Sequence, residues 1–145
     1  LPHLFWVPDI FVCNGWQSAL IPTIYKSEYE GKNEFYNNIK TVLVIHDLDE
    51  YSLAKRSDLI DFGIKLPAGL KGSSVNLYDV ASYSADAILI LDKPGAKISS
   101  KLLKKVAFKD NKNKLTIFEQ KDIENVDYNN ITKSLDQIIA KLTSK

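Results

Sequence analysis

Three runs of apolar, mostly β-branched residues constrain the fold of this chain more than any other feature. They occupy residues 10–13 (IFVC), 41–45 (TVLVI) and 87–91 (AILIL), and a weaker run follows at residues 115–118 (LTIF). None of them alternates polar with apolar residues, which is typical of strands that are covered on both faces. Because helix-like segments separate them, we expect an α/β fold: a Rossmann-like parallel sheet of about four strands with flanking helices and right-handed crossovers.

Four segments have helical periodicity. The first runs from Gly15 or Trp16 to Tyr25 or Lys26, with Pro22 as a kink or a boundary. The other three are residues 75–85 behind a cap at Asn76, residues 98–106, and a last helix behind Asn129 or Asn130 in which Ile131, Leu135, Ile138, Ile139 and Leu142 share one face. Residues 28–38 and 49–74 are polar and contain glycine, so we expect exposed connections there, the second with a short helical stretch near residues 52–61.

Length and composition exclude several classes of protein. The 145 residues fit one domain, and a net charge of +1 supplies no field that would gather nucleic acid. No apolar stretch approaches the roughly 18 residues that cross a bilayer, and no basic segment opens a secretory signal. A single cysteine permits no internal disulfide, which favours a reducing compartment. We therefore expect a cytoplasmic protein that binds neither nucleic acid nor membrane.

The amino end of the chain predicts a fragment. The sequence contains no methionine, and it opens on an apolar phrase without a helix cap. We therefore expect residues 1–145 to be a single α/β domain taken from a longer lobe. A truncated sheet leaves an unpaired edge and apolar surface. This predicts either self-association or a missing amino-terminal segment that covers the sheet edge.

Three turns are candidates for chemistry because ligands of open parallel sheets bind outside the carboxyl ends of the strands. These turns are residues 14–17 (NGWQ), 46–50 (HDLDE) and 92–95 (DKPG), and we expect them to converge on one rim. His46 is either a loop histidine bonded to the backbone or a polar contact to a sugar hydroxyl or phosphate.

The turn at residues 14–17 allows two interpretations as well. Asn14 and Gly15 make either a simple tight turn or a close backbone approach to an anion at a helix start. Trp16 could stack on a sugar and Gln17 could hydrogen-bond it, but Trp16 could equally belong to the core.

Acidic residues and the lone cysteine give weaker signals. Asp47, Asp49 and Glu50 suggest a metal or an acid–base pair, whereas a charge run beside a loop is more often a solvated surface. One cysteine and two distant histidines lack zinc spacing, and Cys13 within a predicted strand favours a core role. Neither a phosphate-cradling glycine motif nor a Gly-x-Ser-x-Gly elbow occurs. We therefore predict no metal and no cofactor, and we assign no catalytic residue.

Three stretches resemble one known family. Residues 8–22 (PDIFVCNGWQSALIP) are similar to the PDIvHchdWhtaLiP stretch of bacterial glycogen and starch synthases. Residues 41–48 (TVLVIHDL) resemble the strand and turn that end in vHN, and residues 76–87 (NLYDVASYSADA) resemble the helix that ends in yADavttVS. The stretches keep the family's order and match the carboxyl half of the amino-terminal catalytic lobe, in a short single-lobe type.

The resemblance implies a fold, an activity and a set of contacts. The fold is GT-B, of which this chain would form part of the amino-terminal lobe. The activity is transfer of glucose from ADP-glucose to an α-1,4-glucan with retention of configuration, so ADP-glucose and α-glucan are the implied partners. By the same resemblance, His46 matches a histidine placed against the donor sugar, Asp47 matches the neighbouring asparagine, and Trp16 matches the motif tryptophan.

The sequence also departs from the family pattern at these turns. Gln17 stands where the family has a second histidine, and Asn14 with Gly15 replaces a His-Asp pair. Asp47 puts a negative charge near a diphosphate, which is unfavourable unless the charge is paired. Three hypotheses stay open: a glucosyltransferase lobe that is not competent as this fragment alone, a non-catalytic glucan-binding or regulatory relative, and a protein-interaction scaffold.

Overall fold

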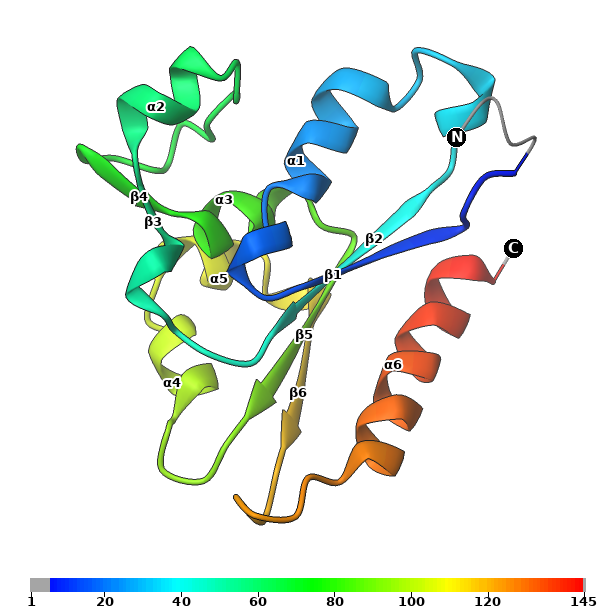
Figure 1. The fold of residues 1–145 in the computed structure, drawn as a ribbon, viewed down its shortest axis with the longest axis vertical. Coiled ribbons are helices and arrows are strands. Elements are labelled where there is room, and N and C mark those ends of the chain that lie inside the picture. Colours follow the sequence, from blue (N-terminus) through cyan, green and yellow to red (C-terminus); the bar gives the residue numbers. More distant parts are fainter. Residues whose placement is uncertain (1–5, 145) are drawn as a thin grey trace.

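The structure is a computed structural model that describes residues 6–144. Its main sheet contains four parallel strands in the order β1-β2-β5-β6 (Figure 1). The strands are β1 Ile10–Asn14, β2 Lys40–Ile45, β5 Ala87–Asp92 and β6 Leu115–Glu119. Each strand coincides with one of the apolar runs, so the predicted four-strand parallel sheet with flanking helices is confirmed.

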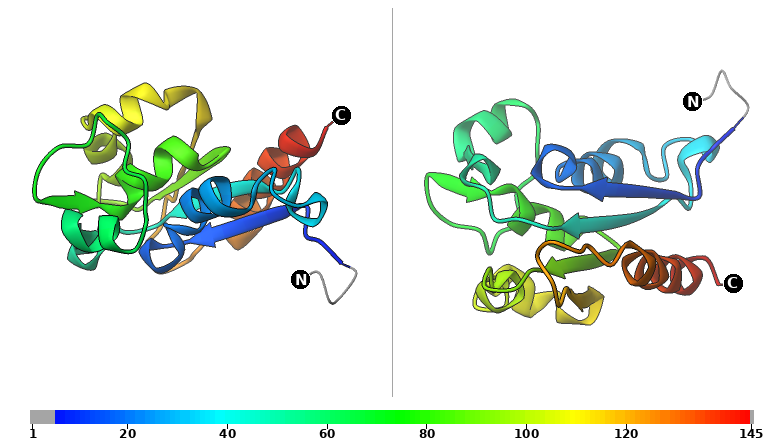
Figure 2. Two further views of the ribbon diagram at one scale, coloured as in Figure 1. Left: turned by 90° about the horizontal axis from the view of Figure 1, so that it is seen from above. Right: turned by 60° about the horizontal axis from the view of Figure 1, so that its bottom comes forward.

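Helices cover the sheet on both faces because alternate strand residues point to opposite sides. On one face, α3 (Leu77–Ser84), α4 (Ile98–Leu102) and α5 (Val106–Asp110) pack on the larger core. Helix α6 (Tyr128–Thr143) lies on the other face (Figure 2). Its Ile138 packs over Val42, Val44, Ala87 and Leu89. Coverage of both faces holds for the central strands only, since Val12 on β1 is 46% exposed and Ile117 on β6 is 41% exposed.

Residues 16–29 follow a helical path in three pieces rather than in the single helix expected. The pieces are the 3-10 turn η2 Trp16–Ser18, α1 Ile21–Ile24 and the π turn η3 Tyr25–Tyr29. Pro22 lies in the first turn of α1, where its missing N–H leaves no bond unmade. The π turn η3 ends at Tyr29, so it overlaps the start of the predicted connection at residues 28–38. The rest of this connection is mostly exposed and contains the short turn η4 Glu34–Tyr36.

The segment 49–74 is more ordered than an exposed connection. It contains the 3-10 turn η5 Glu50–Ser52, strand β3 Leu53–Lys55 and helix α2 Arg56–Asp61. Strand β4, Ser74–Asn76, pairs with β3 in a separate antiparallel sheet. This two-stranded sheet was not expected from the sequence, because each strand has only three residues and β3 is largely exposed.

The remaining helices were predicted in position but not in every boundary. Asn76 caps α3 as expected, since its side chain accepts a hydrogen bond of 2.9 Å from the Tyr78 amide. The segment 98–106 is not one helix, because extended backbone at Lys105 separates α4 from α5; a 3-10 turn, η6 Lys112–Lys114, then leads into β6. Asp127, not Asn129 or Asn130, caps α6. Within the described residues, none of the helices combines the length and apolar character that a membrane span requires.

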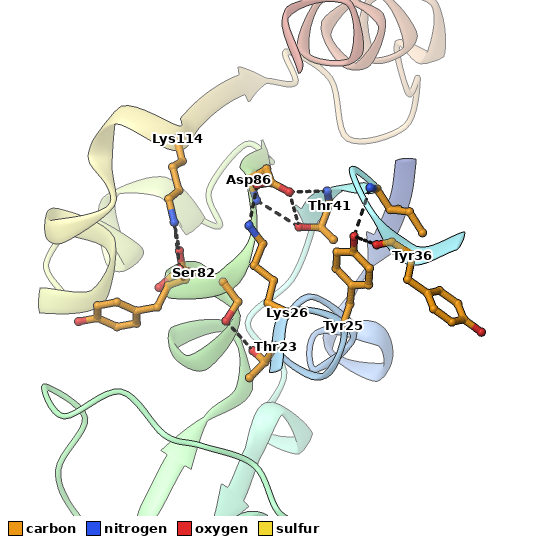
Figure 3. A network of polar contacts seen from close by, with 11 residues as sticks. Thr23, Tyr25, Lys26, Tyr36, Thr41, Ser82, Asp86 and Lys114 are labelled. Carbon is orange, nitrogen blue, oxygen red and sulfur yellow. Dashed lines mark hydrogen bonds and ion pairs between the residues drawn. The ribbon is translucent and has the colours of Figure 1, made fainter. Parts of the chain in front are cut away.

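A polar network ties the helices to the sheet at the amino ends of β2 and β5 (Figure 3). The Asp86 carboxylate accepts bonds from Thr41 N at 2.8 Å, from Thr41 Oγ1 at 3.0 Å and from Lys26 Nζ at 2.8 Å. Nearby, Lys114 Nζ at the end of η6 donates to the carbonyl of Ser82 on helix α3 at 3.1 Å. This network lies at the end of the sheet opposite to the carboxyl ends of the strands.

Candidate functional site

The turns after β1 and β2 lie side by side at the carboxyl edge of the sheet. Asn14, the last residue of β1, pairs with Val44, and the Gly15 amide donates to the Val44 carbonyl at 3.0 Å. The Asn14 carbonyl in turn accepts a bond of 2.9 Å from Ser18 Oγ. The first two of the three predicted turns therefore meet, as expected for neighbouring parallel strands.

Gly15 brings two polar side chains together at this edge. Its backbone has φ 73° and ψ 178°, a region that essentially only glycine occupies. A Cβ atom at this position would lie 2.8 Å from Gln17 Oε1 and 3.2 Å from His46 Nε2. The side chains of Gln17 and His46 thus approach the same point of the backbone, and the absence of a side chain on Gly15 leaves them room to do so.

His46 is connected to the interior through Asp47 and a tyrosine that the sequence did not single out. Nδ1 of His46 lies 3.2 Å from Asp47 Oδ2, and Tyr78 Oη donates to Asp47 Oδ1 at 3.1 Å. The His46 and Asp47 side chains are 35% and 38% exposed, whereas Tyr78 is fully buried in α3. A buried phenol therefore supports a carboxylate, which in turn faces the imidazole at the edge.

Tyr78 stays protonated under ordinary conditions. Burial raises the pKa of its hydroxyl most, and the negative charges of Asp47 and Asp49 raise it further, while the backbone amide of Trp16 acts in the opposite direction. The phenol is therefore a hydrogen-bond donor to Asp47. No local sequence pattern marks Tyr78, because the contact joins a helix residue to a distant turn.

Trp16 packs against the core, as one of its two interpretations expects, and stacking on a sugar stays a prediction. Its indole packs against the larger core, and its ring centroid lies 6.2 Å from that of Tyr51 with an interplanar angle of 34°. Tyr51 is 68% exposed and follows the His46 turn. The two rings form an aromatic ledge beside Gly15, and Tyr51 is a second residue that the sequence analysis missed, although an aromatic residue directly after the 46–50 turn was a usable signal.

The acidic residues after His46 do not gather around one point. Asp49 caps the turn η5 by accepting a 2.9 Å bond from the Tyr51 amide. Glu50 is exposed. Across residues 6–144, no group of three or more histidine, cysteine, aspartate or glutamate side chains is arranged to hold a metal ion.

The third turn follows β5, and its carboxylate makes its contacts with the helix that comes next. The Asp92 carboxylate accepts bonds from the Ile98 amide at 2.8 Å and the Ser99 amide at 3.1 Å, so it caps the start of α4. Burial raises the pKa of Asp92, but hydrogen bonds from Ser99 and Ile98 outweigh it and hold the pKa below its ordinary value. A polar hollow of about 170 Å³ beside it is lined by Asp92, Lys93, Pro94, Lys97, Glu119 and Gln120. The contacts of Asp92 therefore do not join it to the His46 group.

Cys13 belongs to the core, as predicted. It is 1% exposed, and burial raises the pKa of its thiol from 9.0 to about 11. A thiol in this environment is protonated and out of reach of a ligand at the edge.

The fold and the residues at its carboxyl edge together define a class of protein. A four-strand parallel sheet with flanking helices, here with Gly15 and His46 side by side at the strand ends, corresponds to a portion of the amino-terminal lobe of a GT-B protein. The family model for the starch synthase catalytic domain matches residues 1–97, and the chain belongs to this family.

Curated relatives agree with this membership. The chain is 32% identical over 150 aligned residues to the glycogen synthase of Clostridium perfringens, covering 97% of this chain and 30% of that protein. It is 32% identical over 93 residues to the glycogen synthase of Lachnospira eligens, covering 64% of this chain and 19% of that protein. A segment of 48 residues is 48% identical to the glycogen synthase of Alkaliphilus metalliredigens, covering 33% of this chain and 10% of that protein. The chain thus spans less than a third of the length of these relatives.

Proposed function

We propose that the turns after β1 and β2 form a sugar-binding edge for an α-1,4-glucan, as part of a glycogen or starch synthase-type glucosyltransferase. By resemblance, that enzyme transfers glucose from ADP-glucose to the glucan. The observation that carries the proposal is the meeting of His46 Nε2 and Gln17 Oε1 at Gly15, with 3.2 and 2.8 Å to its Cβ position.

The chemistry of these side chains suits a sugar. Sugar hydroxyls donate and accept hydrogen bonds, and an imidazole and an amide can do the same. Small-ligand sites combine aromatic walls with a few polar groups that fix orientation. The ledge of Trp16 and Tyr51 supplies the aromatic wall beside the polar pair.

In our proposal, glucose transfer requires parts of the enzyme that lie outside these 145 residues. The chain spans 30% of the Clostridium perfringens glycogen synthase, so most of an enzyme of that length lies outside it. We expect residues 1–145 to bind glucan and to need the remaining parts of such an enzyme for glucose transfer.

A second candidate function is glucan binding without catalysis. Asp47 favours it, because its carboxylate is 38% exposed and would face the diphosphate of a nucleotide sugar. In this reading the edge keeps its contacts to glucan and has lost the nucleotide.

Isothermal titration calorimetry with maltoheptaose and, separately, with ADP-glucose distinguishes these functions. We expect maltoheptaose to bind and His46→Ala to weaken it about tenfold, while His3→Ala, at the only other histidine, has no effect. ADP-glucose binding together with glucose transfer supports the enzyme, and glucan binding alone supports the second candidate. A chain that binds neither ligand contradicts both, and leaves the protein-interaction scaffold.

A further inference from the structure

Asn14 and Gly15 are the only asparagine–glycine pair in the chain. An asparagine followed by glycine readily loses its side-chain amide, because the backbone nitrogen of the second residue can attack the side-chain carbon of the first. Glycine carries no side chain that obstructs this approach. Every other asparagine is followed by a residue with a side chain, so the sequence singles out this one position.

The fold leaves the Asn14 side chain accessible. Asn14 is the last residue of β1, and it is exposed. Its carbonyl accepts the 2.9 Å bond from Ser18 Oγ, but no hydrogen bond described within residues 6–144 involves its side-chain amide. The amide carbon can therefore turn toward the peptide bond that follows it.

The Gly15 amide, in contrast, is held by the sheet. It is buried and donates to the Val44 carbonyl at 3.0 Å. While this bond is intact, the nitrogen keeps its hydrogen and its position beside β2, so it does not attack Asn14. Asn14 and Val44 are the last pair of the β1–β2 ladder, and the ends of such elements open more readily than their centres. Opening at this pair releases the nitrogen.

The same edge that exposes Asn14 also requires the glycine beside it. Gly15 has φ 73° and ψ 178°, and a Cβ atom there would lie 2.8 Å from Gln17 Oε1. By the resemblance described above, the family pattern has a His-Asp pair at these two positions. The labile pair is therefore a feature of this chain and not of the family pattern.

We propose that Asn14 is a site of spontaneous deamidation, and that opening of the last pair of the β1–β2 ladder sets its rate. The Gly15 nitrogen gives up its proton to hydroxide and forms a bond to Asn14 Cγ. The side-chain nitrogen takes up a proton and leaves as ammonia, which closes a succinimide ring. Water then opens this ring at one of its two carbonyls, and the product is either aspartate or isoaspartate.

Both products change the edge. Aspartate adds a negative charge at the end of β1. Isoaspartate lengthens the main chain before Gly15 by a methylene group, which displaces the Gly15 amide from Val44 and its α-carbon from His46 Nε2. A consequence for glucan binding rests on the proposed function, whereas the modification itself does not.

Peptide mapping by mass spectrometry tests the modification without any ligand. The chain is incubated in mildly alkaline buffer with and without urea, and is then digested under acidic conditions that preserve asparagine. We expect Asn14 to convert before any other asparagine, and to convert at least about tenfold faster in urea, where the bond to Val44 is lost. A folded chain in which Asn14 stays intact overturns the inference, and so do equal rates in the two buffers.

Two controls isolate the chemistry. Asn38 is also exposed and has a positive φ of 68°, but it is followed by Ile39, whose branched side chain obstructs the attack. Asn38 should stay intact in the folded chain, and its conversion ahead of Asn14 would overturn the assignment. Asn14→Gln should stop the modification at this position, because a glutamine must close a larger and less favourable ring.

Calorimetry with maltoheptaose before and after the incubation measures the consequence. We expect the affinity of the unsubstituted chain to fall about tenfold once Asn14 has converted. The affinity of Asn14→Gln, whatever its starting value, should not change over the same incubation. An affinity that survives complete conversion overturns the effect on the edge. A chain that binds no maltoheptaose before incubation contradicts the proposed function alone, because the mass spectra do not depend on it.

Discussion

Gly15 and His46 lie so close at the carboxyl edge of the sheet that a Cβ atom on Gly15 would be 3.2 Å from His46 Nε2. The backbone of Gly15, with φ 73° and ψ 178°, is also one that residues with side chains rarely adopt. Two independent constraints therefore demand glycine at this position. One is conformational and local, whereas the other depends on the neighbouring strand.

Gly15→Ala should reveal both constraints. We expect a loss of unfolding free energy of about 1–2 kcal/mol from the backbone conformation, together with displacement of His46 and at least about tenfold weaker maltoheptaose binding. Gly63→Ala is the control, because Gly63 has φ 80° and open space around its Cβ position. Urea unfolding and calorimetry check the pair. Equal glucan binding in the two variants would contradict the role assigned to the edge.

The two central strands of the sheet, β2 and β5, could be predicted from the sequence because they are mostly buried. In β2, residues 41–45 are all buried, and such a strand has to be apolar along its whole length. The small sheet of β3 and β4 could not be predicted in this way. Leu53 is 58% exposed, and within β3 only the middle residue, Ala54, is partly buried. A pattern of burial this short does not distinguish these three residues from a loop.

The candidate site was predictable in part as well. Gly15 and Gln17 follow the end of β1 and His46 follows the end of β2, and parallel pairing of these strands alone brings such turns together. Tyr78 reaches Asp47 through a hydrogen bond across 31 sequence positions, which depends on how α3 packs rather than on any local spacing. Asp92 ends β5 in the same parallel sheet, and its carboxylate caps α4, because the unpaired amides at the start of a helix attract it.

Cys13 should be unreactive while the protein is folded. Burial raises the pKa of its thiol from 9.0 to about 11, so the thiolate fraction at pH 8 is about 100-fold below that of a free cysteine. Its 1% exposure slows access of a reagent further. Ellman's reagent should therefore label the native chain at a rate set by unfolding, and should label one thiol per chain at once in urea. Fast labelling of the native protein would rule out this environment.

Asp86→Asn should lower stability in a pH-dependent manner. Burial raises the pKa of Asp86, but hydrogen bonds from Lys26 and Thr41 outweigh it and hold the pKa below its ordinary value of 3.8. The folded state therefore binds this proton more weakly than the unfolded chain does. The stabilisation by Asp86 is complete above the ordinary value and is lost as the pH falls through the lowered one.

Urea unfolding at a series of pH values measures this effect. At pH 7 we expect Asp86→Asn to cost about 2 kcal/mol, because it weakens bonds from Lys26 Nζ and from the amide and hydroxyl of Thr41. Toward pH 2.5 the difference between the two proteins should shrink. Lys26→Met, which removes only one of the three donors, should cost about 1 kcal/mol. A difference that is constant with pH would contradict the assignment.

The 145-residue chain should self-associate through β1. Within residues 6–144 this strand pairs only with β2, and we expect the backbone groups along its other side to pair with a strand of another copy. Val12 is 46% exposed, and an apolar hollow of about 310 Å³ adjoins the strand. The hollow is lined by Phe11, Ile21, Ile24, Tyr25, Tyr29 and Tyr36.

Val12→Lys should shift the chain toward the monomer in light scattering coupled to size-exclusion chromatography, because a charged residue on an edge strand opposes pairing. The matched control is Ile117→Lys on β6, the opposite edge, where Ile117 is 41% exposed. Hollows beside β6 are lined by charged residues such as Glu119 and Lys121, so association should not depend on that edge. A monodisperse monomer of the unmodified chain, or an effect of Ile117→Lys alone, would show that β1 is not the surface that brings copies together.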